Sequence, residues 1–242
     1  MLVVSIKGCD ASLLLNSTST NAVEKEARPN LSLSGYDVID DIKTRLEQEC
    51  PDTVSCADIV ALAARDAVSY QFQRPIWRVL KGRRDGIISS ASEANINLPS
   101  PFSNFTTLKQ LFSSKGLNVI DLVTLSGAHT IGVSHCGVIG RRLNFTGKGD
   151  VDPSLDPTYA EFLRTKCSRT TPTTILEMDP QSSTSFDSHY YRNLNENRGL
   201  FQSDAALLND PTSAVISELL ENPAFSLLNL HGQCKIWEQC KY

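Results

Sequence analysis

Apolar residues recur every three or four positions along most of this chain, which is the spacing of one face of an α-helix. In residues 36–49 this pattern follows Ser34, a candidate N-cap residue. In residues 53–68 the pattern begins near Ser55, and Asp58 stands three positions later, as in a capping box. Because the body of this second segment is small and apolar, we expect a buried helix there.

Four later segments carry the same helical pattern: 104–116, 118–137, 188–199 and 213–222. Ser126 and Gly127 interrupt the second of them, which therefore predicts either two helical pieces or one kinked helix. Residues 77–86 are too short and too charged for a core helix and predict a hairpin or a surface loop. Residues 144–187 lack periodicity and are rich in Thr, Pro, Ser and Asp, so they predict mostly loop. The predicted fold class is mostly α.

Composition places the chain among soluble globular proteins, with 40% hydrophobic and 21% charged residues. Its 242 residues are enough for one large domain or for two lobes with a core. The net charge is −4 and no run of Lys or Arg is visible, so nucleic acid is not an expected partner. No apolar stretch approaches the roughly 18 residues of a membrane-spanning helix, so no membrane association is expected.

The cysteines and the glycosylation sequons suggest an oxidising compartment. Seven scattered cysteines without C-x-x-C spacing argue against a zinc ribbon and leave buried thiols or long-range disulfides open. The sequence N-x-S/T occurs at four places: Asn16, Asn30, Asn104 and Asn144. The segment from Met1 to Ile6 is too short for the apolar part of a signal peptide. Together with the odd number of cysteines, this predicts that a segment is missing.

His129 is the histidine whose neighbours most favour a ligand role. Ser126, Gly127 and Ala128 precede it, and such small side chains let a bulky group approach the ring. The sequence has no H-E-x-x-H or G-x-S-x-G motif, which argues against the commonest zinc protease and serine hydrolase sites. The alternative is a helix-terminal histidine that is simply hydrogen-bonded.

Two groups of oxygen-bearing side chains are candidate sites for a hard cation such as Ca²⁺. Asp179 and Asp187 bracket a loop rich in Ser and Thr, and they lack EF-hand spacing. The second group lies near the start of the chain: Gly8, Asp10, Ser12 and Glu24. For both groups, the residues alone also fit a polar turn without an ion.

Seven ordered blocks resemble the secreted plant haem peroxidases, called class III. They are GCDASLLL, TVSCADIVALAARDAV, WRVLKGRRDG, ANINLP, DLVTLSGAHTIGVSHC, FDSHYYRNL and GLFQSDAALL, and they cover roughly residues 6–225. The stretch 121–131 fits the proximal haem-ligand signature throughout. The resemblance implies one partial peroxidase domain over residues 1–242, with haem between two helical lobes and a divergent tail at 226–242. It also implies a monomer that uses H₂O₂ to oxidise small phenolic donors, in hydrogen peroxide catabolism and the oxidative stress response.

The resemblance also implies a role for individual residues. His129 would be the axial ligand of the iron of haem b, and Asp204 would accept the other ring N–H of His129. The proximal Ca²⁺ ligands would be Thr130, Asp179, Ser182 and Asp187. The distal Ca²⁺ ligands, an incomplete set, would be Ile6 through its carbonyl, Gly8, Asp10, Ser12 and Glu24. The carbonyl of Pro99 would bind the substrate, and Cys136 would pair with Cys167.

Other family side chains receive no site role. Phe186, Tyr190 and Tyr191 fit core packing, and Arg83 and Arg84 are expected to be structural or partly solvated.

Two departures from the family limit these expectations. The distal histidine and arginine, which would precede the SIKGCDAS block, are expected to be absent, and Cys9 and Cys50 would lose their usual partners. From Ser226 onward the chain departs from the family helix in a way that fits a frame-shifted reading, which leaves Cys56 without its usual partner. The alternatives are therefore a catalytically impaired product that binds haem and Ca²⁺, and a disulfide-bonded glycoprotein module without haem. By family the protein is expected to be secreted to the cell wall or vacuole.

Overall fold

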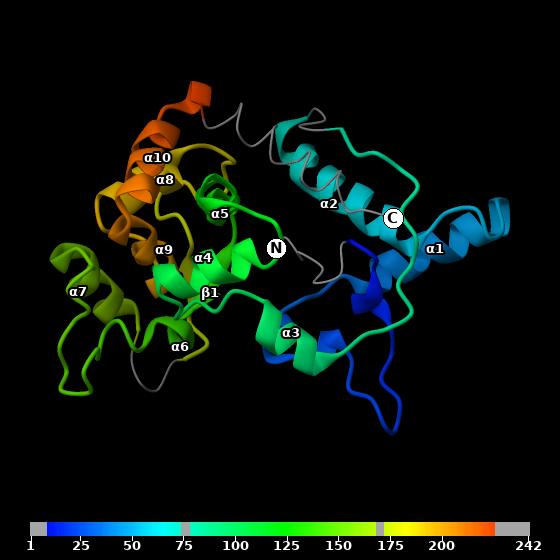
Figure 1. Ribbon diagram of the computed structural model, residues 1–242, viewed down its shortest axis with the longest axis horizontal. Helices are drawn as coiled ribbons and strands as arrows, with labels where there is room; N and C mark the ends of the chain where they lie inside the picture. The colour runs from blue at the N-terminus through cyan, green and yellow to red at the C-terminus, as the bar shows by residue number, and fades with distance from the viewer. Residues whose placement is uncertain (1–8, 74–77, 168–171, 226–242) are drawn as a thin grey trace. The chain divides into compact units, whose positions relative to one another are not determined.

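The computed structural model describes residues 9–73, 78–167 and 172–225 (Figure 1). The described residues form two compact units, one ending at Leu98 and the other beginning at Pro99. Helices dominate both units, which confirms the mostly α prediction. Ile6, Gly8 and the tail at 226–242 lie outside the described residues, and the single-domain organisation stays a prediction.

The first unit consists of short and long helices. They are the 3₁₀-helices Ser12–Leu14 (η1), Glu24–Glu26 (η2) and Arg28–Asn30 (η3), and the α-helices Tyr36–Glu49 (α1), Cys56–Phe72 (α2) and Ala91–Asn97 (α3). Helix α1 packs against α2. Its N-cap is Gly35, with a φ of 87°, so the prediction that Ser34 caps this helix was wrong. Glycine reaches this left-handed conformation without a Cβ penalty, whereas serine does not.

Helix α2 begins with the predicted N-cap, because Ser55 Oγ accepts the Asp58 N–H at 3.1 Å. The Asp58 carboxylate does not complete a capping box with Ser55. It accepts the backbone N–H groups of Gly82 at 2.6 Å and Arg83 at 3.2 Å. Asp85 accepts the Cys56 N–H at 3.0 Å, which satisfies a further donor of the first turn. These bonds hold residues 78–86 against α2 as a loop, so the loop alternative is confirmed for its described part.

Helix α2 is less buried than its sequence predicts. Only Ala57, Asp58, Ile59 and Ser69 are buried among the helix side chains that the structure describes. Among the described elements α2 packs chiefly against α1, so most of its remaining side chains are half-buried or exposed.

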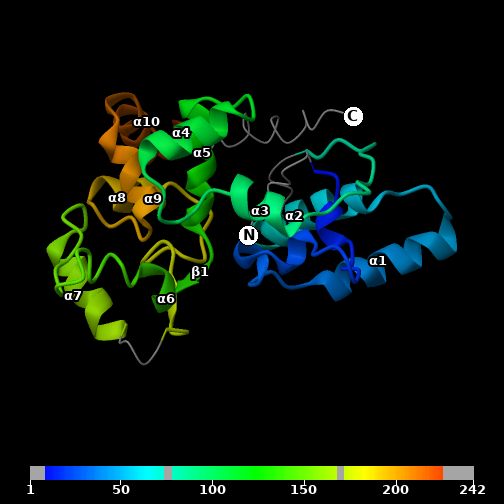
Figure 2. The same cartoon turned by 60° about the horizontal axis from the view of Figure 1, so that its bottom comes forward.

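The second unit contains most of the predicted site. Its helices are Phe105–Ser113 (α4), Val119–Ser126 (α5), Gly127–Thr130 (η4), Cys136–Ile139 (α6), Pro157–Lys166 (α7), His189–Asn195 (α8), Gln202–Ala205 (α9), Ala206–Asn209 (η5) and Pro211–Glu221 (α10). Its strands, Val133–His135 (β1) and Ile175–Glu177 (β2), are antiparallel, with Ser134 opposite Leu176. Helices α8 and α10 lie side by side in both views (Figures 1 and 2).

Two apolar clusters form the core of the second unit. One gathers buried side chains from α4, α5, α8, η5 and α10, with Tyr191 and Leu194 at most 1% exposed. The other gathers side chains from α6, α7, β2 and the segment before α9, including Ile139 and Leu200. The predicted site residues His129 and Asp204 lie on elements that follow or adjoin these clusters, so packing fixes the backbone that carries them.

Two sequence predictions have different outcomes here. The interrupted segment 118–137 does form two helical pieces at its start, α5 and η4. The prediction of mostly loop for 144–187 missed α7, in which Asp156 accepts the Tyr159 N–H at 2.7 Å and Pro157 occupies the first turn. An Asp-Pro pair at a helix start was the available signal.

A disulfide joins Cys136 and Cys167, with the Cα atoms 5.3 Å apart.

In the described part of the chain, no helix has the length and apolar character needed to cross a membrane.

Candidate functional site

The centre of the candidate site is a hydrogen-bonded pair, His129 and Asp204. His129 Nδ1 lies 2.8 Å from Asp204 Oδ1. The same oxygen accepts the Tyr190 O–H at 3.0 Å, and Asp204 Oδ2 accepts the Phe201 N–H at 2.8 Å. Three donors therefore converge on one carboxylate that is only 2% exposed. Sequence reasoning assigned Tyr190 to core packing and missed this hydrogen bond, although the FDSHYYRNL block contains the residue.

Burial and the facing charge act in opposite directions on the pKa of each member of the pair. Burial raises the pKa of Asp204, but the charge and hydrogen bond of His129, with the bonds from Phe201 and Tyr190, outweigh this and leave the pKa below its ordinary value. Burial lowers the pKa of His129, but the charge of Asp204 and the hydrogen bond to it together outweigh burial, and the pKa ends above its ordinary value. An ionised Asp204 therefore holds a proton on Nδ1 of the imidazole.

The other ring nitrogen, Nε2 of His129, remains available. It makes no hydrogen bond to the residues that the structure describes, and the side chain is 38% exposed. The rings of Tyr190 and Phe201 meet the imidazole edge-on, with centroids 6.0 and 5.5 Å away. The hydrogen bond at Nδ1 and the two aromatic rings thus hold the imidazole in place, while Nε2 stays accessible. This arrangement fits a ligand for the iron of a haem.

Gly127 allows the helix before His129 to approach α8. A Cβ atom added at Gly127 would lie 2.2 Å from the hydroxyl oxygen of Tyr191. That hydroxyl donates to the Val123 carbonyl at 3.2 Å and the Thr124 carbonyl at 3.3 Å. The small residue that the sequence placed near His129 is therefore needed for packing against Tyr191.

The four side chains predicted for the proximal Ca²⁺ site come together in the second unit. Thr130 Oγ1 lies 2.9 Å from Asp179 Oδ2 and 3.3 Å from Asp187 Oδ1. Ser182 Oγ lies 2.7 Å from Asp187 Oδ2. Asp179 and Thr130 are fully buried. Thr130 directly follows His129, so this oxygen cluster adjoins the pair described above.

Two further side chains contact this oxygen cluster and were missed by sequence reasoning. His189 Nδ1 lies 2.9 Å from Asp179 Oδ1, and Asn193 Nδ2 donates to the same oxygen at 2.7 Å. They stand four residues apart in α8 and so share one helix face. Both bind Oδ1 of Asp179, whereas Thr130 binds Oδ2, so the second oxygen is held apart from α8.

A smaller oxygen cluster lies in the first unit. Ser12 Oγ is 2.8 Å from Asp10 Oδ1 and 2.9 Å from Glu24 Oε1. Ser89 Oγ accepts the Glu24 N–H at 2.9 Å, and Asn30 Nδ2 donates to the Glu24 carbonyl at 2.8 Å. Three of the five predicted distal ligands are therefore adjacent, and the other two lie outside the described residues.

Both clusters present carboxylate and hydroxyl oxygens, the donors that Ca²⁺ prefers. Among the described residues, no group of three or more His, Cys, Asp or Glu is arranged to hold a metal ion. The clusters instead combine two carboxylates each with hydroxyls from Ser or Thr. Their donor chemistry fits a hard cation.

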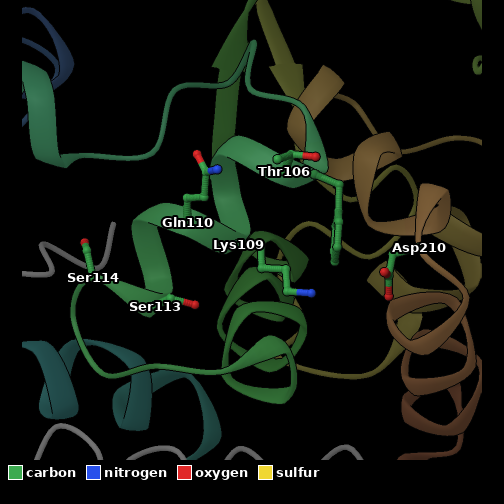
Figure 3. Close-up of a pocket in the computed structure, with 7 residues that line it drawn as sticks. Thr106, Lys109, Gln110, Ser113, Ser114 and Asp210 are labelled. Atoms are coloured by element: carbon green, nitrogen blue, oxygen red, sulfur yellow. The ribbon is translucent and has the colours of Figure 1, made fainter.

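The remaining predicted positions are less informative. Pro99 is exposed and is the first residue of the second unit. Among the described cysteines, Cys50 and Cys56 are free thiols. A shallow pocket is lined by Lys109 and other residues of α4 and by Asp210, the N-cap of α10 (Figure 3). It contains none of the predicted site residues.

Comparison with known proteins identifies the family. A family model described as peroxidase matches residues 2–222. Three similar proteins of Arabidopsis thaliana are Peroxidase 24, 60% identical over 223 residues, Peroxidase 30, 56% identical over 219, and Peroxidase 1, 50% identical over 227. These matches cover 90%, 89% and 93% of this chain, and 64%, 66% and 69% of the respective relatives. The chain thus spans about two thirds of the length of these relatives.

The match extends over most of the chain, and it confirms the resemblance to the class III plant peroxidases that the seven sequence blocks carry. The chain belongs to the peroxidase family.

Proposed function

We propose that the protein is a haem- and calcium-binding peroxidase that uses H₂O₂ to oxidise phenolic donors. The observation that carries the proposal is the geometry of His129, whose Nδ1 is bonded to Asp204 while Nε2 stays accessible. A buried carboxylate behind a metal-binding histidine fixes the tautomer and makes the imidazole more basic. The proposed roles are hydrogen peroxide catabolism and the oxidative stress response of a secreted, monomeric plant protein.

The residues of this chain would share the work of binding and orientation. When bound to His129, haem b would supply an iron that is oxidised by peroxide and then takes electrons from the donors. Asp204 would hold the Nδ1 proton, and Tyr190 would help to hold Asp204 in place. A Ca²⁺ ion on Thr130 and Asp179 would stabilise the turn that follows His129, because Thr130 is the next residue. The second Ca²⁺ ion would bind at Asp10, Ser12 and Glu24, and the Pro99 carbonyl would accept a hydrogen bond from the phenolic donor.

A second candidate function is a haem- and Ca²⁺-binding protein with impaired catalysis. Peroxide cleavage needs a general acid–base group on the face of the haem opposite the axial ligand. The three described histidines are otherwise placed: His129 is bonded to Asp204, His189 is bonded to Asp179, and His135 is exposed on β1. All three belong to the second unit. This observation favours weak turnover by the chain as given.

Haem reconstitution tests the proposal. The chain is refolded with haem and Ca²⁺, and the Soret band is compared for the wild type, His129→Ala and the control His135→Ala. We expect the band in the wild type and the control and its loss in His129→Ala. A chain without haem uptake, or equal uptake in all three, would refute the axial role of His129.

Steady-state oxidation of guaiacol then separates the two candidates. If the chain as given has no general acid–base group opposite His129, turnover should fall by about 10²–10⁴ relative to a full-length relative. Turnover at the level of that relative would refute impaired catalysis and support the first candidate.

A further inference from the structure

A buried arginine, Arg142, contacts the segment that leads into Asp204. It is 3% exposed and forms an ion pair with Asp152, in which Nε lies 3.0 Å from Oδ2. Arg142 Nη2 donates to Ser154 Oγ at 3.0 Å, and Ser154 Oγ donates to Asp152 Oδ1 at 2.7 Å. The three side chains thus form a closed ring of hydrogen bonds inside the second unit.

Both Asp152 and Arg142 are expected to be charged in this ring of hydrogen bonds. Burial raises the pKa of Asp152, but hydrogen bonds from Ser154 and from Arg142 outweigh it and leave the pKa below its ordinary value. The guanidinium of Arg142 keeps its charge at any physiological pH and offers five N–H donors in a fixed plane. Nε of Arg142 donates to Asp152 and Nη2 donates to Ser154, whereas Nη1 faces the backbone.

The Nη1 group alone contacts three consecutive carbonyls. Arg142 Nη1 contacts the oxygen of Gly199, and it lies 3.3 Å from the oxygens of both Leu200 and Phe201. Leu200 is fully buried in the second apolar cluster. One side chain therefore fixes the path of residues 199–201, which lead directly into α9 and Asp204.

Residues 199–201 in turn contact both members of the pair. A Cβ atom added at Gly199 would lie 2.9 Å from Asp204 Cβ, so the backbone of Gly199 rests directly against that side chain. The Phe201 N–H donates to Asp204 Oδ2 at 2.8 Å, and the Phe201 ring meets the His129 ring edge-on at 5.5 Å. Movement of this segment would displace the acceptor of His129 and its ring neighbour together.

We infer that Arg142 is a positioning residue, which holds Asp204 in hydrogen-bonding distance of His129 through the carbonyls of residues 199–201. The part of this inference that concerns a bound haem rests on the proposed function. The hydrogen bonds of Arg142 go to neither His129 nor Asp204, and its effect passes through Gly199 and Phe201. A lysine at this position would keep the positive charge opposite Asp152. Its single nitrogen would not reproduce the planar fork that reaches Asp152, Ser154 and the carbonyls together.

Amide hydrogen exchange on the full chain without haem tests the placement directly. The exchange rate of the Phe201 amide is divided by that of the Leu122 amide, which is bonded to the Asn118 carbonyl in α5. In Arg142→Lys we expect this ratio to rise by about tenfold, because the Phe201–Asp204 hydrogen bond opens more often. Ser154→Ala is a milder variant that should raise the ratio in the same direction.

The control is Arg83→Lys in the first unit. Arg83 also forms an ion pair with an aspartate, Asp58, and both side chains are 10% exposed. The variant Arg83→Lys also removes a planar guanidinium group, but it does so away from residues 199–201. The ratio of the Phe201 and Leu122 exchange rates should therefore stay at the wild-type value. An unchanged ratio in both Arg142→Lys and Ser154→Ala, or an equal rise in Arg83→Lys, would overturn the inference.

The haem-loaded protein supplies a second readout that is independent of turnover. The iron–imidazole stretching band in resonance Raman spectra reports the hydrogen bond on Nδ1. Asp204→Asn should shift this band, Arg142→Lys should shift it in the same direction, and Arg83→Lys should leave it in place. A band that moves in Asp204→Asn alone would overturn the role of Arg142. A chain that takes up no haem would refute the proposed function, and the exchange ratio would still decide whether Arg142 positions Asp204.

Discussion

Replacing Asp204 by asparagine should destabilise the chain well beyond an ordinary Asp→Asn change. Asp204 Oδ1 accepts from His129 Nδ1 and Tyr190, and Oδ2 accepts from the Phe201 N–H. An amide has one oxygen and one NH₂ group, so it cannot present an acceptor on both sides. If the amide oxygen of the asparagine faces His129, its NH₂ group faces the Phe201 N–H, which loses its acceptor. If the amide is turned around, His129 Nδ1 and the Tyr190 hydroxyl lose their acceptor instead.

The magnitude follows from this count. At least one donor is left without a partner at a site that is 2% exposed, which costs about 1–3 kcal/mol. The hydrogen bond from His129 also loses its charged acceptor, and bonds to charged groups are worth about 1 kcal/mol more than neutral ones. We therefore expect Asp204→Asn to lower the free energy of unfolding by about 2–4 kcal/mol.

Urea unfolding of the full chain without haem, followed by far-ultraviolet circular dichroism at pH 7, measures this loss. The control is Asp210→Asn, because Asp210 is an N-cap residue whose Oδ1 accepts the Ser213 N–H at 3.0 Å. Asparagine caps helices about as well as aspartate, so the control should stay within about 0.5 kcal/mol of the wild type. Equal losses in the two variants would refute the argument that Asp204 is a buried acceptor of three donors.

Three further predictions concern other parts of the chain. Gly127→Ala should lower the free energy of unfolding by about 1–3 kcal/mol in urea unfolding, since its Cβ would meet the Tyr191 hydroxyl. Asp152 has a lowered pKa, so its stabilising contribution is present above about pH 4 and is lost as the pH falls through that lowered value; Asp152→Asn should flatten the acid side of the stability curve. After expression through a secretory route, peptide mapping with a glycosidase should find glycan at exposed Asn104 and none at Asn30, whose Nδ2 is buried and bonded to Glu24.

Each of these predictions has a clear contrary result. Wild-type stability of Gly127→Ala would mean that α8 can move away from η4 without loss. An unchanged acid limb in Asp152→Asn would mean that Asp152 does not titrate with unfolding. Glycan at Asn30 in the folded protein would contradict the hydrogen bond between its amide and Glu24.

Local sequence patterns predicted much of the helical structure but less of its ends. The 3.6-residue spacing located α1, α4, α5, α8 and α10, because one apolar face is enough to mark an amphipathic helix. The N-cap of α1 was misplaced by one residue, since Gly35 can adopt a left-handed conformation that the hydrophobic pattern does not report. Helix α7 was missed because its buried residues lie among many Thr, Pro and Ser residues. The Asp156-Pro157 start was the overlooked signal.

The candidate site shows the same division. The sequence alone named His129, Thr130 and Asp204 through the family blocks, and it named Asp179 and Asp187 as the carboxylates that bracket a loop rich in Ser and Thr. Only the tertiary structure showed Tyr190 bonded to Asp204 and His189 bonded to Asp179. These contacts depend on how α8 lies against α9 and the 179–187 loop, which no local pattern encodes.

The sequence by itself determined the family and the mostly helical class, and it named the residues that are proposed to bind an iron and a hard cation. Tertiary structure decided which atoms meet: Nδ1 of His129 on Asp204, and Arg142 on the carbonyls of residues 199–201. Residue types and their spacing can be read from the sequence. The contact between His129 and Asp204 cannot, because 74 residues lie between them in the chain. Packing of the two apolar clusters brings such distant residues together, because burying their side chains fixes the backbone of every segment between them.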